Sequence, residues 1–300
     1  GAIYAGTSTL GNTTKNNVLT IDGMNIFGRT MYGGYTQSMT GDSTGNEVIL
    51  RNIPAPGGPG AFDVYGGWSK NGKATGNTIT LEGSGGYSTG YGMYYYASLH
   101  GGYSGKAGAT TADNTAGNTL KVTAKDSGAG SVENFENLKF VLGDNVASGD
   151  TMLYVRYYMQ NLDWTKIAVD NASTWGAGKN GTQHVTLYKG RGFTLSNYGT
   201  SSVNGTSGDY EYGITTNTTT PTVATVAASE IYFDRNKFQN SHVTYNDKTA
   251  QADDEKNGIY HTLPPTPGVY SGAIYAGTST LGNTTKDNKL TIDGMNIFGR

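Results

Sequence analysis

A unit of about 30 residues recurs four times between residues 3 and 124. Each unit begins with an apolar residue, an aromatic residue and one or two glycines, and then reaches an asparagine that is followed by alternating residues. The paired sequences are IYAG and NVLTIDG, MYGGY and NEVILRN, VYGGW and NTITLEG, and LHGGY and NTLKVTA. A unit this short buries its apolar face only by stacking on its neighbours. The repeat therefore predicts an all-β protein, a parallel β-helix (β-solenoid) with coils of roughly 30 residues.

The strand that ends each unit is expected to bury alternate residues and to leave the intervening ones in water. The predicted inward pairs are Leu19 and Ile21, Val48 and Leu50, Ile79 and Leu81, and Leu120 and Val122. The alternation continues with looser spacing at Ile167 and Val169, Val185 and Leu187, Phe193 and Leu195, Ile231 and Phe233, and Val243 and Tyr245. The solenoid is therefore expected to continue through the chain.

Glycine and asparagine occupy fixed positions in every unit. Glycine pairs are expected at tight corners, because corners need positive φ angles that glycine adopts readily and asparagine next most readily. Two roles remain open for the asparagine at the start of each strand. It is there for its turn propensity alone, or its side chain joins a hydrogen-bonded ladder between coils. The four residues are Asn17, Asn46, Asn77 and Asn118.

A second repeat is much longer. Residues 272–300 match residues 1–29 at 27 of 29 positions, with an offset of 271 residues. The two differences are Asn16 against Asp287 and Val18 against Lys289, and the second falls at a position predicted to face water. We interpret residues 1–271 as one period of a tandemly repeated β-solenoid and residues 272–300 as the start of the next, near-identical period. A period of about nine coils would extend about 45 Å.

Composition narrows the class of protein. The chain has 46 Gly, 22 Tyr, 15% charged residues and no cysteine, which favours β structure with negligible helix and leaves no disulfide or thiolate site. A net charge of −2 with dispersed Lys and Arg argues against nucleic acid and anionic membranes as partners. No apolar run has the length of a transmembrane helix, so we expect no direct membrane insertion by this segment.

Two glycine motifs match known functional patterns by sequence alone. GYSTG at residues 86–90 fits the G-x-S-x-G pattern of a nucleophile elbow, and GAGKNG at residues 176–181 fits the G-x-G-x-x-G pattern of a dinucleotide loop. Both patterns need a helix after the motif, and neither sequence is followed by a helical pattern. Chance matches are expected in so glycine-rich a chain, so we assign no function to either.

The sequence gives little support for a metal site or a catalytic site. The histidines His100, His184, His242 and His261 are isolated, and His100 occupies the aromatic position of its unit. Asp253, Asp254 and Glu255 form an acidic cluster that reads as a solvated loop, with a calcium site as the sharper alternative. We therefore predict no catalytic residue, no metal ligand and no cofactor. A carbohydrate-active β-helix enzyme, with grouped carboxylates and an Arg or Lys across adjacent coils, stays as an alternative.

Tyrosine is in surplus, most densely at Tyr87, Tyr91, Tyr94, Tyr95, Tyr96 and Tyr103. Amphipathic rings suit contacts with sugars and proteins. The alternative is that the rings line strand faces and stack along the solenoid.

Residues 134–164 are more apolar than the units before them. The sequences NFENLKFVL, GDTMLYV and NLDWTKIAV, preceded by the YGG and GNTVTL-type blocks, resemble the passenger domains of large Gram-negative autotransporters. The resemblance covers roughly residues 1–195. It implies a right-handed parallel β-helix that is exported through the outer membrane and displayed at the cell surface, and the lack of cysteine suits export of an unfolded chain.

These observations lead to an expected function. The chain is expected to be a non-enzymatic structural protein of the bacterial outer-membrane surface or the extracellular space, a repetitive stalk or filament for adhesion, biofilm or self-association. Its expected partners are further copies of itself and glycans or proteins of host or neighbouring cells. A carbohydrate-active enzyme or a glycan-binding adhesin module is the alternative.

Overall fold

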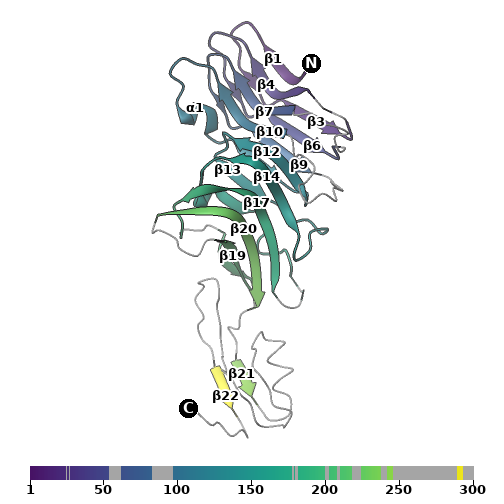
Figure 1. Ribbon diagram of the computed structural model, residues 1–300, viewed down its shortest axis with the longest axis vertical. Helices are drawn as coiled ribbons and strands as arrows, with labels where there is room; N and C mark the ends of the chain where they lie inside the picture. The colour runs from purple at the N-terminus through teal and green to yellow at the C-terminus, as the bar shows by residue number, and fades with distance from the viewer. Residues whose placement is uncertain are drawn as a thin grey trace. The chain divides into compact units, whose positions relative to one another are not determined.

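The computed structural model describes residues 1–24, 26, 28–53, 62–82, 97–177, 179, 182–199, 203–207, 210–217, 224–237, 242–245 and 289–292. These residues form an all-β parallel β-solenoid of about 5 turns, with coils of about 31 residues and 4% helix (Figure 1). The predicted fold class and coil length are confirmed. Strands β1, β4, β7 and β10 lie side by side in Figure 1, although a whole coil of sequence separates each from the next.

The first coils repeat one order of elements: a long strand, a short corner element and a second strand. The elements are β1 (Ala2–Ser8), β2 (Thr14–Lys15) and β3 (Val18–Asp22), then β4 (Thr30–Thr36), β5 (Ser43–Thr44) and β6 (Glu47–Arg51), then β7 (Phe62–Ser69), β8 (Ala74–Thr75) and β9 (Thr78–Glu82), then β10 (Ala97–Ser104), α1 (Thr111–Thr115) and β11 (Thr119–Val122). In the fourth of these coils the helix α1 takes the place of the corner strand.

The later elements are longer and less regular. They are β12 (Ser127–Glu133), β13 (Asn137–Phe140), β14 (Thr151–Met159), β15 (Leu162–Asp163), the 3-10 helix Trp164–Lys166, β16 (Ile167–Val169), β17 (Gln183–Ser196), β18 (Gly205–Ser207), β19 (Tyr210–Thr216), β20 (Thr225–Lys237), β21 (His242–Tyr245) and β22 (Lys289–Ile292). Every predicted apolar pair in the later segments lies on a strand, although the structure describes only the backbone of Val243 and Tyr245.

Three parallel sheets run along the first coils. One has the order β1-β4-β7-β10-β12-β14, a second the order β3-β6-β9-β11-β13-β16, and the corner strands form the third, β2-β5-β8. The register aligns equivalent residues of successive coils, so that Leu19 pairs with Val48, Val48 with Ile79 and Ile79 with Leu120. The short repeat in the sequence is therefore the repeat of the backbone.

The core is a set of apolar columns between the sheets. Val48, Ile79 and Leu120 are completely buried, as are Leu50, Leu81 and Val122 in the neighbouring column. The predicted inward faces are confirmed for these strands. Leu19 is only half-buried, because among the described strands β3 has a neighbour, β6, on one side only.

The outward positions of the same strands behave as predicted, with one exception. Val18 is 59% exposed and Thr20 is exposed, and the column that contains Thr20 carries Lys121 and Lys139 in later coils. The prediction was wrong at Thr80, which is buried. Its hydroxyl donates a hydrogen bond to Glu47 Oε1 at 2.9 Å, so this side chain is held against the sheet instead of being hydrated.

The four asparagines form a buried ladder. The Nδ2 groups of Asn17, Asn46 and Asn77 donate to the Oδ1 atom of the asparagine in the next coil, at 2.8, 3.0 and 3.3 Å, ending at Asn118. The backbone N–H groups of the same three residues donate to the same oxygens. Asn46, Asn77 and Asn118 are at most 1% exposed. Of the two roles left open by the sequence, the structure has the ladder.

Three of the four ladder asparagines also bind the coil before them. Nδ2 of Asn46, Asn77 and Asn118 donates to the carbonyl oxygen of Thr14, Ser43 and Ala74, respectively, at 3.2, 3.1 and 3.0 Å. These carbonyl groups lie on the corner strands β2, β5 and β8. One amide side chain therefore joins a strand, a corner and the adjacent coil, and it fixes the distance between them.

The paired glycines are required by close packing and not by positive φ angles, since the first of each pair leaves room for a backbone carbonyl of the next coil and the second for the ladder asparagine. None of Gly33, Gly34, Gly66 or Gly67 has a positive φ, so the expected reason for the pairs was wrong. A Cβ atom on Gly67 would lie 2.5 Å from Asn77 Nδ2 and 2.7 Å from Ser43 Oγ. The second glycine of each pair leaves the space that the asparagine fills.

Positive φ angles occur one residue before each ladder asparagine. Gly45, Gly76 and Gly117 have φ angles of 65°, 66° and 69°, and Asn16 takes the same conformation at 55° in the first coil. Asparagine tolerates this region better than other residues with a Cβ atom. The expected preference for glycine, and then asparagine, where φ is positive is therefore confirmed at the residue before each ladder asparagine.

The described chain packs as two compact units. The first contains Gly1–Asn171, Val185–Ser202 and Thr215–Tyr232, and it holds the columns described above. The second contains Ala172–His184, Val203–Ile214 and Phe233–Arg300. In the second unit β18 pairs with β19 in antiparallel orientation, and the rings of Trp175 and Phe233 pack edge-on at 5.9 Å. The interpretation of residues 1–271 as one period concerns the sequence repeat, which these units do not test.

Substitutions to lysine will test the register of β6. Val48→Lys is expected to lower the free energy of unfolding by about 3 kcal/mol or more, because an inward charge has no water around it. Ile49→Lys is expected to change it by less than about 1 kcal/mol, because Ile49 shares an outward column with Lys121 and Lys139. Urea unfolding of both variants measures the difference, and equal losses would contradict the register.

The coupling between glycine and asparagine gives a second test. Asn77→Ala removes the oxygen that accepts two donors of Asn46, and we expect a loss of about 2–4 kcal/mol. Asn137→Ala is the control, since half-buried Asn137 makes a 3.4 Å bond to Thr119 Oγ1, and its loss should stay under about 1 kcal/mol. Gly67→Ala should also destabilise, and combining it with Asn77→Ala should cost less than the sum of both. If the losses of the two single variants simply add in the double variant, the absence of a side chain at Gly67 is not explained by its contact with Asn77.

Candidate functional site

The most distinctive surface of the described chain is a pair of aromatic columns on the outer face of the largest sheet. The first column consists of Tyr4, Tyr32, Tyr65 and His100, which are aligned by the register of β1, β4, β7 and β10. Successive rings are 5.1, 5.2 and 4.5 Å apart between centroids, and their planes differ by 8°, 11° and 10°. The rings are therefore stacked face to face along the solenoid.

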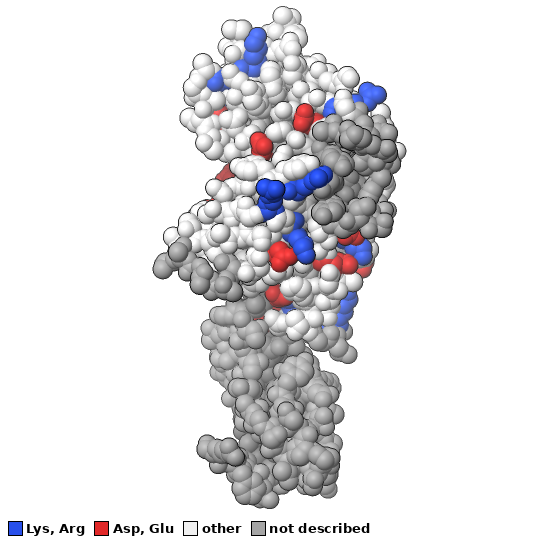
Figure 2. All heavy atoms as spheres, in the orientation of Figure 1, with Lys and Arg blue, Asp and Glu red and all other residues white. Residues whose placement is uncertain are grey.

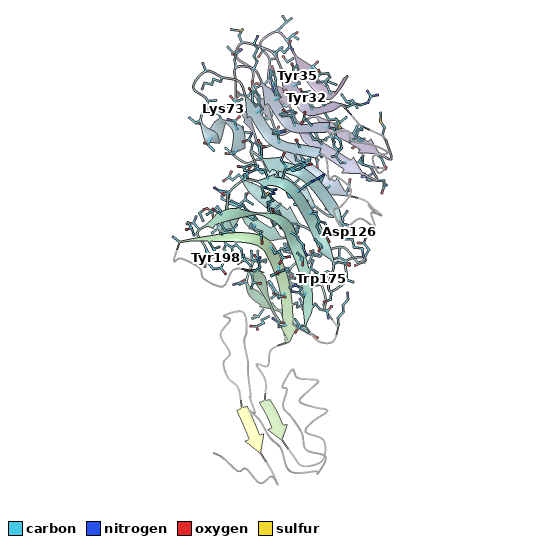
Figure 3. The ribbon with its side chains drawn as sticks, in the orientation of Figure 1. Tyr32, Tyr35, Lys73, Asp126, Trp175 and Tyr198 are labelled. Atoms are coloured by element: carbon cyan, nitrogen blue, oxygen red, sulfur yellow. The ribbon has the colours of Figure 1, made fainter. Side chains whose placement is uncertain are left out.

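The second column consists of Tyr35, Trp68 and Tyr103, three positions further along the same strands. The rings stack at 4.5 and 5.8 Å. Tilted contacts join the two columns, as between Tyr32 and Tyr35 at 4.8 Å (Figure 3). Tyr4 and Tyr103 are each 42% exposed, and they lie at opposite ends of this surface. We call these seven residues the aromatic surface.

The electrostatic environment of the aromatic surface favours neutral side chains. Burial is the main cause that raises the pKa of Tyr32 to about 12, with smaller contributions from the neighbouring tyrosines. Burial also raises the pKa of Tyr65. It lowers the pKa of the His100 imidazole, against the opposing effect of Glu133, whose carboxylate lies 3.7 Å from Nδ1. His100 therefore serves as an uncharged ring in the stack, as its position in the repeat predicted.

Stacking determines what the aromatic surface can bind. A sugar that stacks on an aromatic residue needs an open ring face, and here the ring faces within each column cover one another. The ring edges and hydroxyl groups remain available for hydrogen bonds and for contacts with another protein surface. Of the two readings of the tyrosine surplus, the described residues favour rings that stack along the solenoid.

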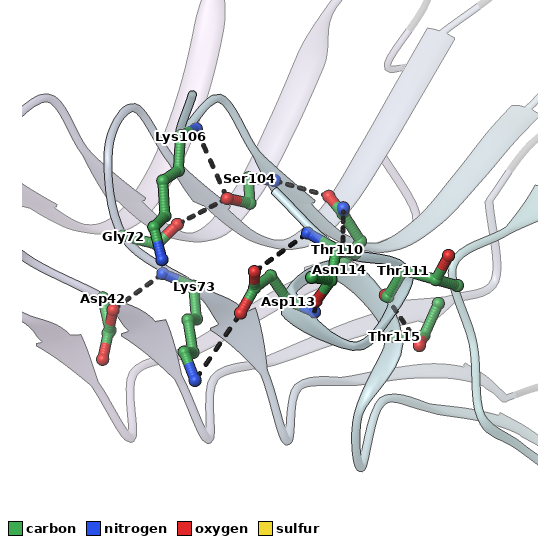
Figure 4. Close-up of polar contacts among 10 residues, drawn as sticks. All are labelled: Asp42, Gly72, Lys73, Ser104, Lys106, Thr110, Thr111, Asp113, Asn114 and Thr115. Carbon is green, nitrogen blue, oxygen red and sulfur yellow. Dashed lines mark hydrogen bonds and ion pairs between the residues drawn. The ribbon is translucent and has the colours of Figure 1, made fainter. Parts of the chain in front are cut away.

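Helix α1 closes the corner of the fourth coil with a small polar cluster (Figure 4). Thr110 and Asp113 form a capping box, and the Thr110 N–H group is the main cause that lowers the pKa of Asp113. Lys73 Nζ lies 3.5 Å from Asp113 Oδ1, and its backbone N–H donates to Asp42 Oδ1 at 2.7 Å. These contacts tie three coils together, so the cluster is accounted for by its role in the fold.

Charged residues elsewhere are paired across coils. Arg51 lies between Asp22 and Glu82 in the outward column, with N to O distances of 3.6 and 2.6 Å. Lys125 pairs with Asp150 at 2.9 Å, beside Asp126, whose pKa is raised mainly by burial. On the face shown in Figure 2, acidic and basic residues are interspersed among uncharged ones. Within the described ranges no three His, Asp or Glu side chains are grouped as a metal ion requires.

The other candidates named from the sequence are dispersed. Gly176 lies in a turn, and the segment after its motif is strand β17 and not a helix. His184 Nδ1 lies 2.6 Å from Asp234 Oδ1, and only the backbone of His242 is described. The motif at residues 86–90, His261, the acidic cluster Asp253, Asp254 and Glu255, and the tyrosines Tyr87, Tyr91, Tyr94, Tyr95 and Tyr96 lie outside the described residues.

Two features went unnoticed in the sequence. The second aromatic column was visible as the residue after each glycine pair, since Tyr35, Trp68 and Tyr103 occupy equivalent positions. Arg235 had no such signal. The residue is 2% exposed, its Cζ atom lies 4.6 Å from the centroid of the Tyr210 ring, and its NH1 group donates to the Ser173 carbonyl at 2.8 Å. Burial lowers the pKa of this guanidinium.

Comparison of the chain with protein-family models, with curated proteins and with solved structures finds no match. The resemblance to autotransporter passenger domains therefore rests on the sequence blocks and on the parallel β-solenoid that the structure confirms. Within the parts of the chain that the structure describes, no helix has the length and hydropathy that crossing a membrane requires.

The pKa of Tyr32 predicts how the solenoid responds to alkali. The folded chain holds this proton up to about pH 12, whereas an unfolded chain releases it near the ordinary value of 10.0. The contribution of Tyr32 to the free energy of unfolding is therefore fully present below about pH 10 and is lost as the pH rises towards 12. Tyr32→Phe should flatten this loss and keep the stack, whereas Tyr157→Phe, at an exposed site outside the aromatic surface, should not. Urea unfolding between pH 9 and 12 measures the free energy of unfolding of each variant. An identical pH dependence for both variants would contradict the assignment of this loss to Tyr32.

Proposed function

We propose that this protein is a non-enzymatic structural solenoid, a stalk or filament of the extracellular space or the bacterial outer-membrane surface that serves adhesion, biofilm or self-association. The observation that carries the proposal is the continuity of the columns. The asparagine ladder, the aromatic stack and the apolar core each repeat at the same register from coil to coil. Such an arrangement extends by adding coils and requires no new kind of interface.

The distribution of polar chemistry supports a structural role. In the described residues the carboxylates of Asp22, Glu82, Asp113 and Asp150 are each held by a lysine or arginine of another coil. The aromatic rings likewise stack on rings of the neighbouring coils. Side chains whose partners are the neighbouring coils stabilise the rod, and a carbohydrate-active site would instead need carboxylates that face an open groove.

Two observations support the proposed location. The blocks shared with autotransporter passenger domains lie on β13, β14 and β16, which continue the sheets of the regular coils. The chain also has no cysteine, so no disulfide can form before or during passage through an envelope. Adhesion to other cells would use exposed ring edges and hydroxyl groups such as those of Tyr4 and Tyr103.

Length is the property that tests the proposal. A period of 271 residues coiled throughout at about 31 residues per coil would hold about nine coils, compared with the roughly 5 turns of the described residues, and each coil would add about 4.8 Å. Chains that carry one, two and three periods are therefore expected to differ in length by about 40–45 Å per period. Electron microscopy and small-angle scattering measure this increment. Particles whose longest dimension does not grow with the number of periods would contradict a structural rod.

A further inference from the structure

Strand β14 contains a β-bulge where it pairs with β12. Between two successive pairs the register advances from Ala129 to Ser131 on β12. On β14 it advances from Val155 to Tyr158, so β14 has one residue more than its partner. A bulge interrupts the alternation of inward and outward side chains and redirects a side chain that would otherwise point inward. The bulge therefore changes which residues of β14 reach the surface.

Three consecutive side chains lie outside the core at the bulge. Val155 and Met159 are buried on either side of it, whereas Tyr157 and Tyr158 are 52% and 50% exposed. Arg156 is half-buried, and its Cζ atom lies 4.7 Å from the centroid of the Tyr157 ring. No ring of the described residues stacks on Tyr158. Its ring face is therefore open, unlike the ring faces within the columns of the aromatic surface.

Strand β17 places a second arginine next to the bulge. The last pair of β14 with β17 is Val155 with Gly190, and an arginine follows it directly on each strand. These residues are Arg156 and Arg191. The buried Tyr188 hydroxyl donates to the Arg191 carbonyl at 2.7 Å, which fixes the backbone from which that side chain extends. Like charges at neighbouring positions of adjacent strands repel each other, so an anion bound between the two arginines would be stabilising.

The surroundings of the two arginines supply no such anion to Arg191. This residue is exposed, and no salt bridge joins it to a carboxylate of the described residues. Lys189 precedes it by two positions and pairs with Glu230 at 3.3 Å, and residues 127–132 of β12 are uncharged. Figure 2 shows basic side chains over β14 and β17, in the middle of the view. This region therefore differs from the charges that are paired across coils.

We propose that Arg156, Tyr157, Tyr158 and Arg191 bind an acidic polysaccharide, a chain of sugars that carry carboxylate groups. We call these four residues the arginine–tyrosine surface. The guanidinium groups bind carboxylates through paired N–H donors, and the open face of Tyr158 packs against the apolar face of a sugar ring. This inference rests on the proposed function, because it names a ligand through which the solenoid adheres.

The combination of side chains favours a polysaccharide over other polyanions. The chain has a net charge of −2, so it has no overall field that attracts nucleic acid or an anionic membrane. Binding must come from local contacts of the arginine–tyrosine surface. An acidic sugar carries a carboxylate and an apolar ring face on one residue, and adjacent arginine and tyrosine side chains can contact both at once.

Titration of the full chain with an alginate oligosaccharide, in which the sugars are uronates, will test the surface. A dextran oligosaccharide of the same length is the neutral control. Arg191→Ala should weaken alginate binding by about tenfold or more, because it removes charge-assisted hydrogen bonds. Lys70→Ala removes an exposed cation at the end of β7, and it should change binding by less than about twofold. Binding of alginate should also weaken as the salt concentration rises.

The tyrosine gives a second measurement that charge alone does not affect. Tyr158→Ala should weaken alginate binding by about fivefold or more, whereas Tyr158→Phe keeps the ring and should stay within about twofold of the unchanged chain. Circular dichroism and thermal unfolding show whether each variant remains folded. Equal effects of Tyr158→Ala and Tyr158→Phe would contradict stacking of a sugar on this ring.

The remaining outcomes separate this ligand from the structural role. Equal binding of dextran, equal weakening by Arg191→Ala and Lys70→Ala, or no binding of alginate at low salt would overturn the proposed surface. An oligothymidylate of the same charge that binds as tightly as alginate would also overturn it, because the surface would then respond to negative charge alone. The structural rod would remain in each case, since it fails only if added periods do not lengthen the particle.

Discussion

The buried asparagine amide is the interaction on which the regular coils depend. Its Nδ2 and Oδ1 atoms bind the coils on either side, and a carbonyl of the corner strand is held by the same amide group. A buried amide without these partners would cost about 1–3 kcal/mol, so each coil must keep the spacing and register that satisfy it. The glycine opposite the amide has no side chain because the amide already fills that space.

The other columns follow from that register. Once equivalent residues are aligned one strand spacing apart, identical aromatic residues stack, as Tyr32 and Tyr65 do at 5.2 Å. The outward charges Asp22, Arg51 and Glu82 come into contact for the same reason, and their alternating sign avoids repulsion between neighbours. Repetition in the sequence therefore favours residues that tolerate a copy of themselves or carry the opposite charge, although the like charges of Lys121 and Lys139 are also neighbours in an outward column.

Sequence periodicity was sufficient to predict the features that repeat. The coil length and the inward faces follow from spacing, because spacing is what a solenoid preserves. For Asn17, Asn46, Asn77 and Asn118 spacing left two alternatives, a ladder or turn propensity alone, and the packed structure was needed to choose the ladder. The reason for the glycine pairs required the packed structure, since a backbone angle and a steric gap give the same residue. The burial of Thr80 and of Arg235 was not predicted, because burial at a single position depends on its neighbours in space, which a sequence repeat does not reveal.

A ladder that satisfies every interior coil leaves its ends unsatisfied. The first coil donates through Asn17 and stacks through Tyr4 on one side, and these groups have the same capacity on the other. Repeating the sequence does not remove the two ends, because it adds interior coils and moves the ends further apart. A coil of the same kind on the other side of Asn17 and Tyr4 would therefore continue both columns in the same register, and strand β22, the near-identical copy of β3, marks where the period begins again.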